Sequence, residues 1–323
     1  MNATIARPSV NRTAAPLVAS LLERRSELRL DVRRHDTGAT LVDAGIRAPG
    51  GLEAGRRIAE ICMGGLGQVQ LTASRGQWPI TLSVTANDPV LACLASQYAG
   101  WSLSSGTGKT RFHALGSGPA RALAVKEALF EELGYRDQAS STYLVLEVDR
   151  EPPAEVVEKV VRDCQIGPEQ LTIVLTPTNS LAGMVQIIAR VLEVGMHKAH
   201  TLGFPLGAVV DGAATAPLAP PGSDTLTAMG RSNDAILFGG IVQLFVRCED
   251  AAAEGLAGQL HSQGSRDYGK PFGAIFKDYG FDFYKIDPML FAPAVAIVTN
   301  LASGRTFRAG ALNDELLMQS FAS

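Results

Sequence analysis

A long apolar stretch between residues 181 and 196 constrains this chain more than any other segment. It reads Leu-Ala-Gly-Met-Val-Gln-Ile-Ile-Ala-Arg-Val-Leu-Glu-Val-Gly-Met, and only Arg190 and Glu193 in it are charged. Ser180 can cap a helix here and Gly203 can end it. A helix that is apolar on most faces is expected to be buried. We therefore predict a buried helix with a guanidinium and a carboxylate on one face, since residues three apart are neighbours on a helix.

The Arg190/Glu193 pair has two interpretations. Burying a charge costs free energy unless the charge is paired or used. The pair could be a structural ion pair that locks a core helix, or it could carry out chemistry. Perturbed ionisable groups cluster at active sites, but structural networks contain them too. The residues alone leave both interpretations open.

Composition narrows the class of protein. The 323 residues are 46% hydrophobic and 19% charged, as in an ordinary globular protein, and the length suits two domains. The net charge of -3 without a basic block argues against nucleic acid as a partner. We see no apolar run long enough for a membrane span and no signal-peptide pattern. Scattered cysteines predict a reducing, cytoplasmic location: Cys62, Cys93, Cys164 and Cys248.

Helix and strand signals mix without strict alternation along the chain. Segments with helical periodicity or capping residues are 13–28, 88–98, 119–133, 153–164, 180–203 and 251–263. Segments that alternate or cluster like strands are 40–46, 69–74, 80–86, 143–148, 171–175, 208–210, 236–247, 294–299 and 306–309. The mixture predicts an α/β fold with mixed, α+β-like sheets, and two domains with a pocket between them. We expect one domain from residues 1–105 with 240–323, and a second from residues 106–239.

A glycine turn at residues 116–123 is a candidate binding element. It reads Gly-Ser-Gly-Pro-Ala-Arg-Ala-Leu and leads into the helix that Pro119 opens. Free amides at such a helix start suit an anion or a carbonyl group. The turn does not fit the dinucleotide fingerprint, because arginine stands where the third glycine belongs. An ordinary turn is the alternative; the candidate binding residues are Gly116, Ser117, Gly118 and Arg121.

Two segments near the C-terminus, Ser265–Phe272 and Asp282–Ala294, concentrate aromatic, charged and proline residues in a chain with only 6% aromatics. Such density in loop-like sequence indicates a binding surface for a flat polar ligand. A structured loop held by proline and aromatic packing is the alternative. The candidates in these segments are Asp267, Tyr268, Lys270, Tyr284 and Lys285.

His197 and His200 could share a face near the end of the long helix. Two histidines without a third ligand make a weak metal site. We expect both, with Lys198, to cap the last helical carbonyls, where cations are favoured. The sequence therefore predicts neither a metal nor a cofactor.

Several separated segments together resemble one family, the methenyltetrahydromethanopterin cyclohydrolases. They are Cys62–Gly67 (Cys-Met-Gly-Gly-Leu-Gly), Gly116–Leu123, Met229–Asp234 (Met-Gly-Arg-Ser-Asn-Asp), Ser265–Phe272 and Asp282–Ala294. The similarity runs from about the first helix to the C-terminus, and the order of the segments makes it specific. The resemblance implies a cytoplasmic, cofactor-free homotrimer with two α/β domains and a pocket between them.

The resemblance also implies the reaction and its residues. The family interconverts the cyclic 5,10-methenyl cation of tetrahydromethanopterin and its N5-formyl form, in one-carbon metabolism. Its members use an arginine and a glutamate three apart on a helix in the pocket, and Arg190 and Glu193 match them. A pterin is the expected partner.

A further segment, Cys93-Leu-Ala-Ser-Gln97, is followed by Tyr98, where archaeal relatives carry lysine. Loss of that cation suggests a substrate with a shorter, less anionic tail, such as a dephospho form. An arginine-heavy composition fits a methylotrophic bacterium that oxidises formaldehyde through this pterin. Cys93, Ser96, Gln97 and Tyr98 are further candidates for substrate binding.

The expected mechanism needs no metal, because the methenyl carbon is already an electrophile between two nitrogens. Glu193 is the predicted general base for an attacking water, a role worth about 10²–10⁴-fold in rate. Arg190 would orient Glu193 and hold the water or the formyl oxygen. Burial would raise the pKa of Glu193 and Arg190 would lower it, and the sequence leaves that balance open.

Two other classes of function remain open on the sequence. One is a metal-dependent amidohydrolase that acts on another cyclic amidine, with His197 and His200 as the first suspected ligands. The other is a non-catalytic pterin-binding protein.

Overall fold

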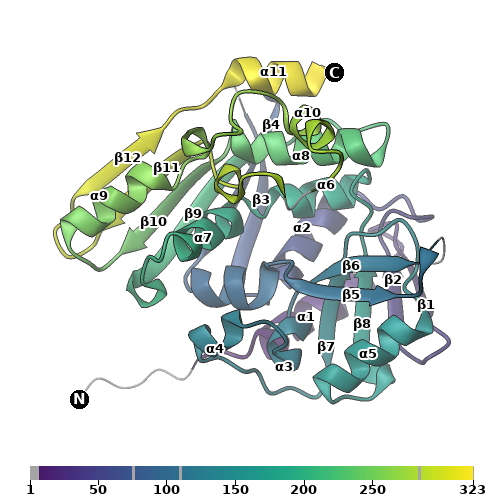
Figure 1. Ribbon diagram of the computed structural model, residues 1–323. Helices are drawn as coiled ribbons and strands as arrows, with labels where there is room; N and C mark the ends of the chain where they lie inside the picture. Colours follow the sequence, from purple (N-terminus) through teal and green to yellow (C-terminus); the bar gives the residue numbers. More distant parts are fainter. Residues whose placement is uncertain (1–6, 75–76, 109–110, 283–284, 323) are drawn as a thin grey trace, which may run out of the picture.

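The computed structural model describes residues 7–74, 77–108, 111–282 and 285–322. Within them the strands form two six-stranded mixed sheets, and Figure 1 shows helices packed on and between these sheets. The predicted α/β fold with mixed sheets is confirmed. Within the same residues, no helix combines the length and the apolar character that a membrane span requires.

The first sheet has a parallel centre and antiparallel edges. Its strands, in spatial order, are β1 (Asp31–Arg34), β2 (Thr40–Asp43), β8 (Leu171–Leu175), β7 (Thr142–Leu146), β6 (Phe112–Ser117) and β5 (Trp101–Ser105). β2, β8 and β7 run parallel to one another, and the other neighbours are antiparallel. Every residue of β7 and β8 is buried, because helices cover both faces. This explains why these strands are continuous apolar runs in the sequence.

The helices on the two faces of the first sheet form separate cores. α1 (Val10–Glu23) and α2 (Leu52–Cys62) pack on one face. α3 (Ala120–Ala124) and α5 (Ala154–Cys164) pack on the other. Successive residues of β7 enter the two cores alternately, as the period of a strand requires.

The second sheet is antiparallel except for one pair. Its strands, in spatial order, are β12 (Thr306–Gly310), β11 (Val295–Asn300), β10 (Ile241–Val246), β9 (Val209–Pro217), β4 (Ile80–Ala86) and β3 (Gly67–Ala73). Only β10 and β11 are parallel. Alternate residues of β10 are buried, which is typical of a sheet with one covered face. The covering helices include α7 (Val191–Thr201), α8 (Thr225–Leu237) and α9 (Asp250–Gln259).

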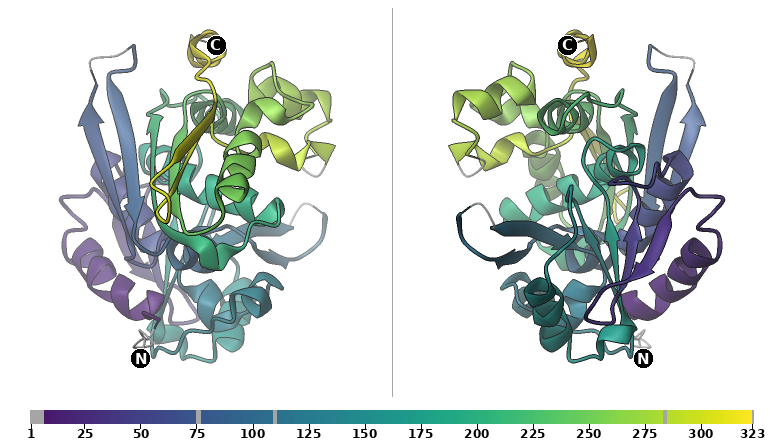
Figure 2. Two further views of the ribbon diagram at one scale, coloured as in Figure 1. Left: turned by 90° about the vertical axis from the view of Figure 1, so that its left-hand side faces the viewer. Right: turned by 90° about the vertical axis from the view of Figure 1, so that its right-hand side faces the viewer.

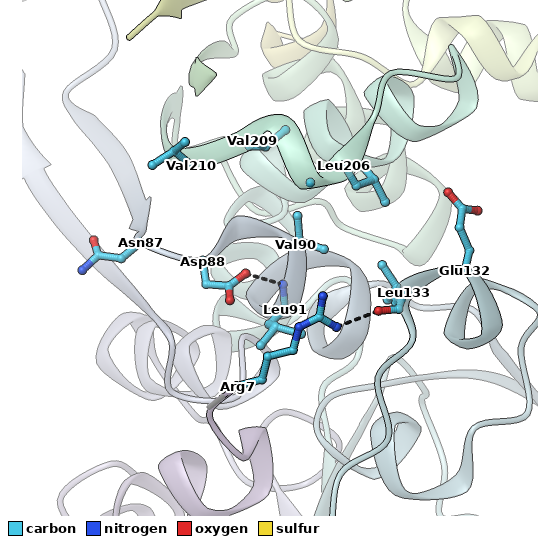
Figure 3. A pocket seen from close by; sticks show the side chains of 11 residues that line it. Arg7, Asn87, Asp88, Val90, Leu91, Glu132, Leu133, Leu206, Val209 and Val210 are labelled. Atoms are coloured by element: carbon cyan, nitrogen blue, oxygen red, sulfur yellow. Dashed lines mark hydrogen bonds between the residues drawn. The ribbon is translucent and has the colours of Figure 1, made fainter. Parts of the chain in front are cut away.

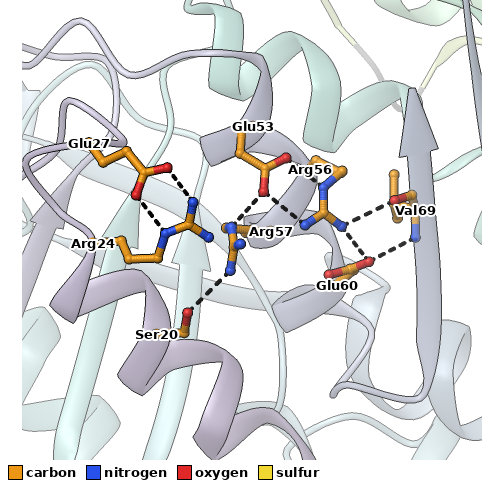
Figure 4. A network of polar contacts seen from close by, with 8 residues as sticks. All are labelled: Ser20, Arg24, Glu27, Glu53, Arg56, Arg57, Glu60 and Val69. Carbon is orange, nitrogen blue, oxygen red and sulfur yellow. Dashed lines mark hydrogen bonds and ion pairs between the residues drawn. The ribbon is translucent and has the colours of Figure 1, made fainter. Parts of the chain in front are cut away.

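A network of ion pairs and hydrogen bonds links α1, α2 and β3, as Figure 4 shows. Arg56 pairs with Glu53 at 2.7 Å and with Glu60 at 2.7 Å, and it also donates to the Val69 carbonyl at 3.2 Å. Exposed ion pairs contribute only about 0–1 kcal/mol each. The apolar cores therefore supply most of the stabilisation here.

The segment that was predicted as one helix over 180–203 is two helices, a correction with consequences for the site. α6 (Leu181–Ile188) begins after Ser180, whose hydroxyl accepts a hydrogen bond from the Gly183 amide at 2.9 Å. The chain then turns at residues 189–190, and α7 follows. The Ala189 carbonyl at this break accepts a hydrogen bond from Gln97 Nε2 at 3.2 Å.

The broken helix lies between the two sheets. α6 packs on α2, which covers the first sheet, and α7 packs on β9 and β10 of the second sheet. The α2–α6 contact is close: a Cβ atom at Gly55 would lie 2.6 Å from the Ala182 carbonyl oxygen. Only glycine allows the two backbones to approach this far.

Several other predicted elements differ in the structure; for example, the helix over 13–28 is Val10–Glu23, and the strand over 208–210 extends over Val209–Pro217. The helix over 119–133 is split into α3 and α4 (Leu129–Leu133), because Val125 adopts a left-handed conformation with φ of 44°. The helix over 88–98 is a π-helix, η1 (Val90–Gln97), capped by the Asp88 carboxylate. The strand over 236–247 is shorter, because α8 extends to Leu237.

The remaining described elements are short or lie near the C-terminus. They are η3 (Pro168–Gln170), η4 (Leu206–Ala208), η5 (Ser262–Gly264), α10 (Phe272–Asp278), η7 (Pro288–Leu290) and α11 (Asp314–Ala322). The domain boundaries near residues 105 and 240 stay a prediction, and strands pair across both of them: β5 with β6, and β9 with β10.

Candidate active site

The break between α6 and α7 sets the positions of Arg190 and Glu193. Arg190 is the N-cap residue of α7, and its carbonyl accepts the Val194 amide at 2.8 Å. Glu193 lies in the first turn of α7, where a carboxylate faces the positive end of the helix dipole. Both side chains are buried, with 7% and 5% of each residue exposed. The predicted buried pair is therefore present, on a helix start instead of a helix middle.

The Arg190 guanidinium makes its closest contacts to groups other than Glu193. Nη1 donates to the Gln97 carbonyl at 2.6 Å, and Nη2 donates to Gln186 Oε1 at 3.3 Å. Nη2 also pairs with Glu147 Oε1 at 3.1 Å. The Glu193 Oε2 atom lies 3.9 Å from Nη1. Arg190 is thus held mainly by Glu147, Gln186 and the backbone of η1.

The Glu193 carboxylate is buried without a strong partner. Burial raises its pKa to about 7, against the opposing effect of Arg190 and of Arg121. Among the described residues its side chain makes no hydrogen bond, and Arg190 is its ion-pair partner. The effect of burial on the pKa of Glu193 is therefore larger than that of the two arginines, a comparison that the sequence left open. The carboxylate can exchange a proton near neutral pH.

The candidates in η1 and the glycine turn lie around this pair. Ser117 Oγ donates to the Gln97 carbonyl at 2.6 Å, and the Gly118 amide donates to the Ser96 carbonyl at 2.9 Å. That amide is therefore already engaged by the protein. Burial raises the pKa of the Cys93 thiol, and the Glu193 charge raises it further. The structure thus brings η1, β6 and the start of α7 together, and Gly116 pairs with β7 at the same place.

Arg121, the remaining candidate of the glycine turn, is fully buried. Its Nη2 atom pairs with Glu127 Oε2 at 2.5 Å. Its Nη1 atom donates to the carbonyls of Leu94 and Ser96, each at 3.0 Å. The guanidinium also lies over the Tyr98 ring, 5.2 Å from its centroid. These contacts fix the end of η1.

His197, Lys198 and His200 do not cap α7, in contrast to the sequence prediction. The His197 ring stacks on Tyr98 with 4.7 Å between centroids, and His200 Nε2 lies 2.7 Å from Glu132 Oε2. Within the described residues, no group of three His, Cys, Asp or Glu side chains could hold a metal ion.

Lys198 instead connects α7 to the C-terminal part of the chain. It is 2% exposed, and its ammonium donates to the His261 carbonyl at 2.7 Å and to the Met289 carbonyl at 2.9 Å. Burial lowers the pKa of Lys198 to about 8.

The candidates near the C-terminus form contacts among themselves and with their own neighbours. Asp267 accepts the Tyr279 hydroxyl at 2.8 Å, and Tyr268 accepts a hydrogen bond from Asn313 at 3.1 Å. Lys270 pairs with Asp278 at 2.5 Å, and Lys285 pairs with Asp282 at 3.6 Å. Tyr284 lies outside the described residues. Among the described residues, no hydrogen bond or ion pair joins this group to Arg190 or Glu193. Figure 2 shows α10 and the β5–β6 hairpin projecting from the same side of the molecule.

Two cavities lie away from the pair. One of about 390 Å³ is lined by Arg7, Asp88 and Glu132, among others, at the start of η1 (Figure 3). Another of about 530 Å³ is mostly apolar, and its lining includes Trp78, Leu218 and Phe321. Neither lining includes Arg190 or Glu193, so the predicted interdomain pocket stays a prediction.

Comparison with known proteins places this arrangement in a family. A family model described as cyclohydrolase (MCH) matches residues 9–321. The chain belongs to this cyclohydrolase family. A relative from Methylobacillus flagellatus, named methenyltetrahydromethanopterin cyclohydrolase, is 60% identical over 97% of this chain and 95% of its own length.

More distant cyclohydrolases of the same name match over similar lengths. The protein of Methylobacterium sp. (strain 4-46) is 54% identical over the full length of both chains. The protein of the archaeon Methanothermobacter marburgensis is 40% identical over 97% of this chain and 99% of its own. The resemblance that the sequence motifs indicated is confirmed.

Two residues at this cyclohydrolase site were not predicted from the sequence, Glu147 and Gln186. Gln186 lies in the apolar run, but it is uncharged and was not singled out there. Glu147 follows the buried strand β7 directly. Polar residues just after the carboxyl ends of parallel strands often lie at binding sites, and this position could have identified Glu147.

Proposed function

We propose that this chain hydrolyses the cyclic 5,10-methenyl cation of a tetrahydromethanopterin-type pterin to the N5-formyl form, reversibly. The observation that carries the proposal is the buried Glu193 carboxylate, with a pKa of about 7, beside Arg190 in a chain of this family. A base that titrates near the working pH is suited to remove a proton from water and to return it.

The chemistry follows from the charges of the reactants. Water attacks the methenyl carbon, and Glu193 takes one proton from it as the new C–O bond forms. The C–N10 bond then breaks, its electron pair stays on N10, and the proton on Glu193 passes to N10. Loss of the remaining hydroxyl proton leaves a formyl group on N5, so the net reaction releases one proton. Carboxylate charge at the site also favours a cationic substrate.

Two buried polar atoms support a place for the attacking water. Arg190 Nε, a donor, and Gln97 Oε1, an acceptor, have no hydrogen-bond partner among the described residues. Buried polar groups normally have partners, so an orphaned donor and acceptor indicate a ligand. We assign both to the attacking water, which can accept from Arg190 Nε and donate to Gln97 Oε1; the formyl oxygen can accept only from Arg190 Nε.

An assay of the purified protein tests this function. We expect the absorbance of the conjugated methenyl cation to disappear on addition of enzyme, without added metal or nucleotide. Tight binding of the pterin without turnover would instead support a binding protein. Inactivation by a chelator, reversed by stoichiometric zinc, would support the metal-dependent amidohydrolase.

We also propose that the subunits form a homotrimer in the cytoplasm, as the family resemblance implies. Sedimentation equilibrium at micromolar concentration should give three times the 34.1 kDa subunit mass. A stable monomer under these conditions would contradict the proposal.

A further inference from the structure

Glu147 is placed to act on the catalytic pair from outside it. It is the residue after β7, and the neighbouring Leu146 pairs with Gly116 of β6. About a third of its side chain is exposed (32%), whereas the side chain of Arg190 is 9% exposed. Glu147 therefore keeps much of its hydration, while Arg190 depends on protein groups to stabilise its charge.

Arg190 is shared unequally between the two carboxylates. Its distance to Glu147 is 3.1 Å, and its distance to Glu193 is 3.9 Å. Gln186 reinforces the first pair: its Nε2 donates to Glu147 Oε1 at 2.9 Å, and its Oε1 accepts from Arg190. Charge-assisted hydrogen bonds at such distances are stronger than a contact at 3.9 Å. The guanidinium is thus held on the Glu147 side.

We propose that Glu147 is a positioning residue for the hydrolysis: it holds the Arg190 guanidinium away from Glu193 and so leaves that carboxylate free to take a proton from water. This inference rests on the proposed function. On this view the strength of Glu193 as a base depends on Arg190, Gln186 and Glu147, because Gln186 and Glu147 determine where the positive charge of Arg190 lies.

The charged and titratable groups that face Glu193 come from four elements. Arg190 precedes α7, Arg121 belongs to α3, Glu147 follows β7, and the Cys93 thiol belongs to η1. Neutralising Glu147 removes a negative charge near Glu193 and also frees Arg190 to pair with it. Both effects stabilise the ionised form of Glu193, so both lower its pKa.

The test is the pH profile of kcat/KM for Glu147→Gln between pH 5 and pH 9. Glutamine keeps an oxygen that can accept from Arg190 and Gln186 but removes the charge. The wild-type rate should rise through a midpoint near 7, the pKa of Glu193. The variant's midpoint should be lower by about one pH unit or more, the scale of a nearby charge. Glu151→Gln is the matched control, because Glu151 is a partly exposed glutamate paired with Arg47 at 2.9 Å.

A direct titration separates this inference from the proposed function. The Glu193 carboxyl carbon can be followed by 13C NMR and identified by its loss in Glu193→Gln. A lower pKa of Glu193 in Glu147→Gln, but not in Glu151→Gln, supports the positioning role. Unchanged midpoints in both measurements would overturn it, even if the variant were slow. Absence of wild-type turnover would overturn the proposed function instead, and the NMR titration would still decide the role of Glu147.

Discussion

The Glu193→Gln variant is expected to lose about 10²-fold or more of the wild-type turnover, the scale of a missing general base. The amide keeps the size of the side chain and can still form hydrogen bonds, but it cannot accept a proton from water near pH 7. Steady-state kinetics should show the loss in kcat. A variant at the exposed Glu254 of α9, Glu254→Gln, is the control and should keep wild-type rates.

The same variant should be more stable than the wild type above pH 7. Burial raises the pKa of Glu193 from 4.5 to about 7, so the native state binds this proton more tightly than the unfolded chain does. The contribution of protonated Glu193 to the wild-type free energy of unfolding is therefore fully present below pH 4.5. It is lost as the pH rises to about 7. The loss is on the order of 3 kcal/mol, and glutamine does not suffer it.

Thermal unfolding at pH 5 and at pH 8 measures this difference on the kinetic samples. If Arg190 and Glu193 formed a purely structural ion pair, Glu193→Gln should instead be less stable than the wild type, because removing one partner of a buried pair costs about 3–5 kcal/mol. Near-wild-type turnover together with a much lower melting temperature would leave the mechanism without its base.

Arg121→Met is expected to destabilise the fold by about 3–5 kcal/mol, the cost of breaking a buried ion pair. Arg121 is fully buried, and its removal leaves Glu127 and the carbonyls of Leu94 and Ser96 without their donor. Methionine fills similar volume but donates no hydrogen bond. Chemical denaturation should show the effect as a lower midpoint.

The exposed pair Arg24–Glu27 in Figure 4 provides the control for Arg121. Arg24→Met should leave the unfolding midpoint close to that of the wild type, because an exposed ion pair adds little stability. If Arg121 served only to bind substrate, Arg121→Met would raise KM and leave the unfolding midpoint unchanged. That result would remove the structural role assigned to it.

The elements that the sequence indicated most strongly are buried ones, because their apolar patterns are visible in the chain. The apolar run around Arg190 and the continuous strands β7 and β8 were recognised because their patterns are local and periodic. The break at residues 189–190 was not, because neither alanine nor arginine marks a helix end. Strands β5 and β6 were also missed, since they are rich in serine and other residues without strong strand preference, and pairing decides their conformation.

The residues of the candidate site also divide into those that the sequence indicated and those that it did not. The apolar run indicated Arg190 and Glu193, the glycine turn indicated Ser117, and the family resemblance added Gln97. These four residues contact one another or lie close together in the fold. Glu147 was missed because it fell inside the strand predicted over 143–148, so its position just after the end of β7 was not recognised. Its importance arises only when β7 is placed beside the α6–α7 break, a contact between distant parts of the chain.

The close approach of α2 and α6 at Gly55 has a consequence for how far the helix break can move. Because α2 touches the backbone of α6, which leads to Arg190, we expect these two helices to move together at this point. Tightly packed interfaces tend to switch between discrete arrangements and resist continuous deformation. We therefore expect Arg190 and Glu193 to be held in the same arrangement with and without a bound ligand.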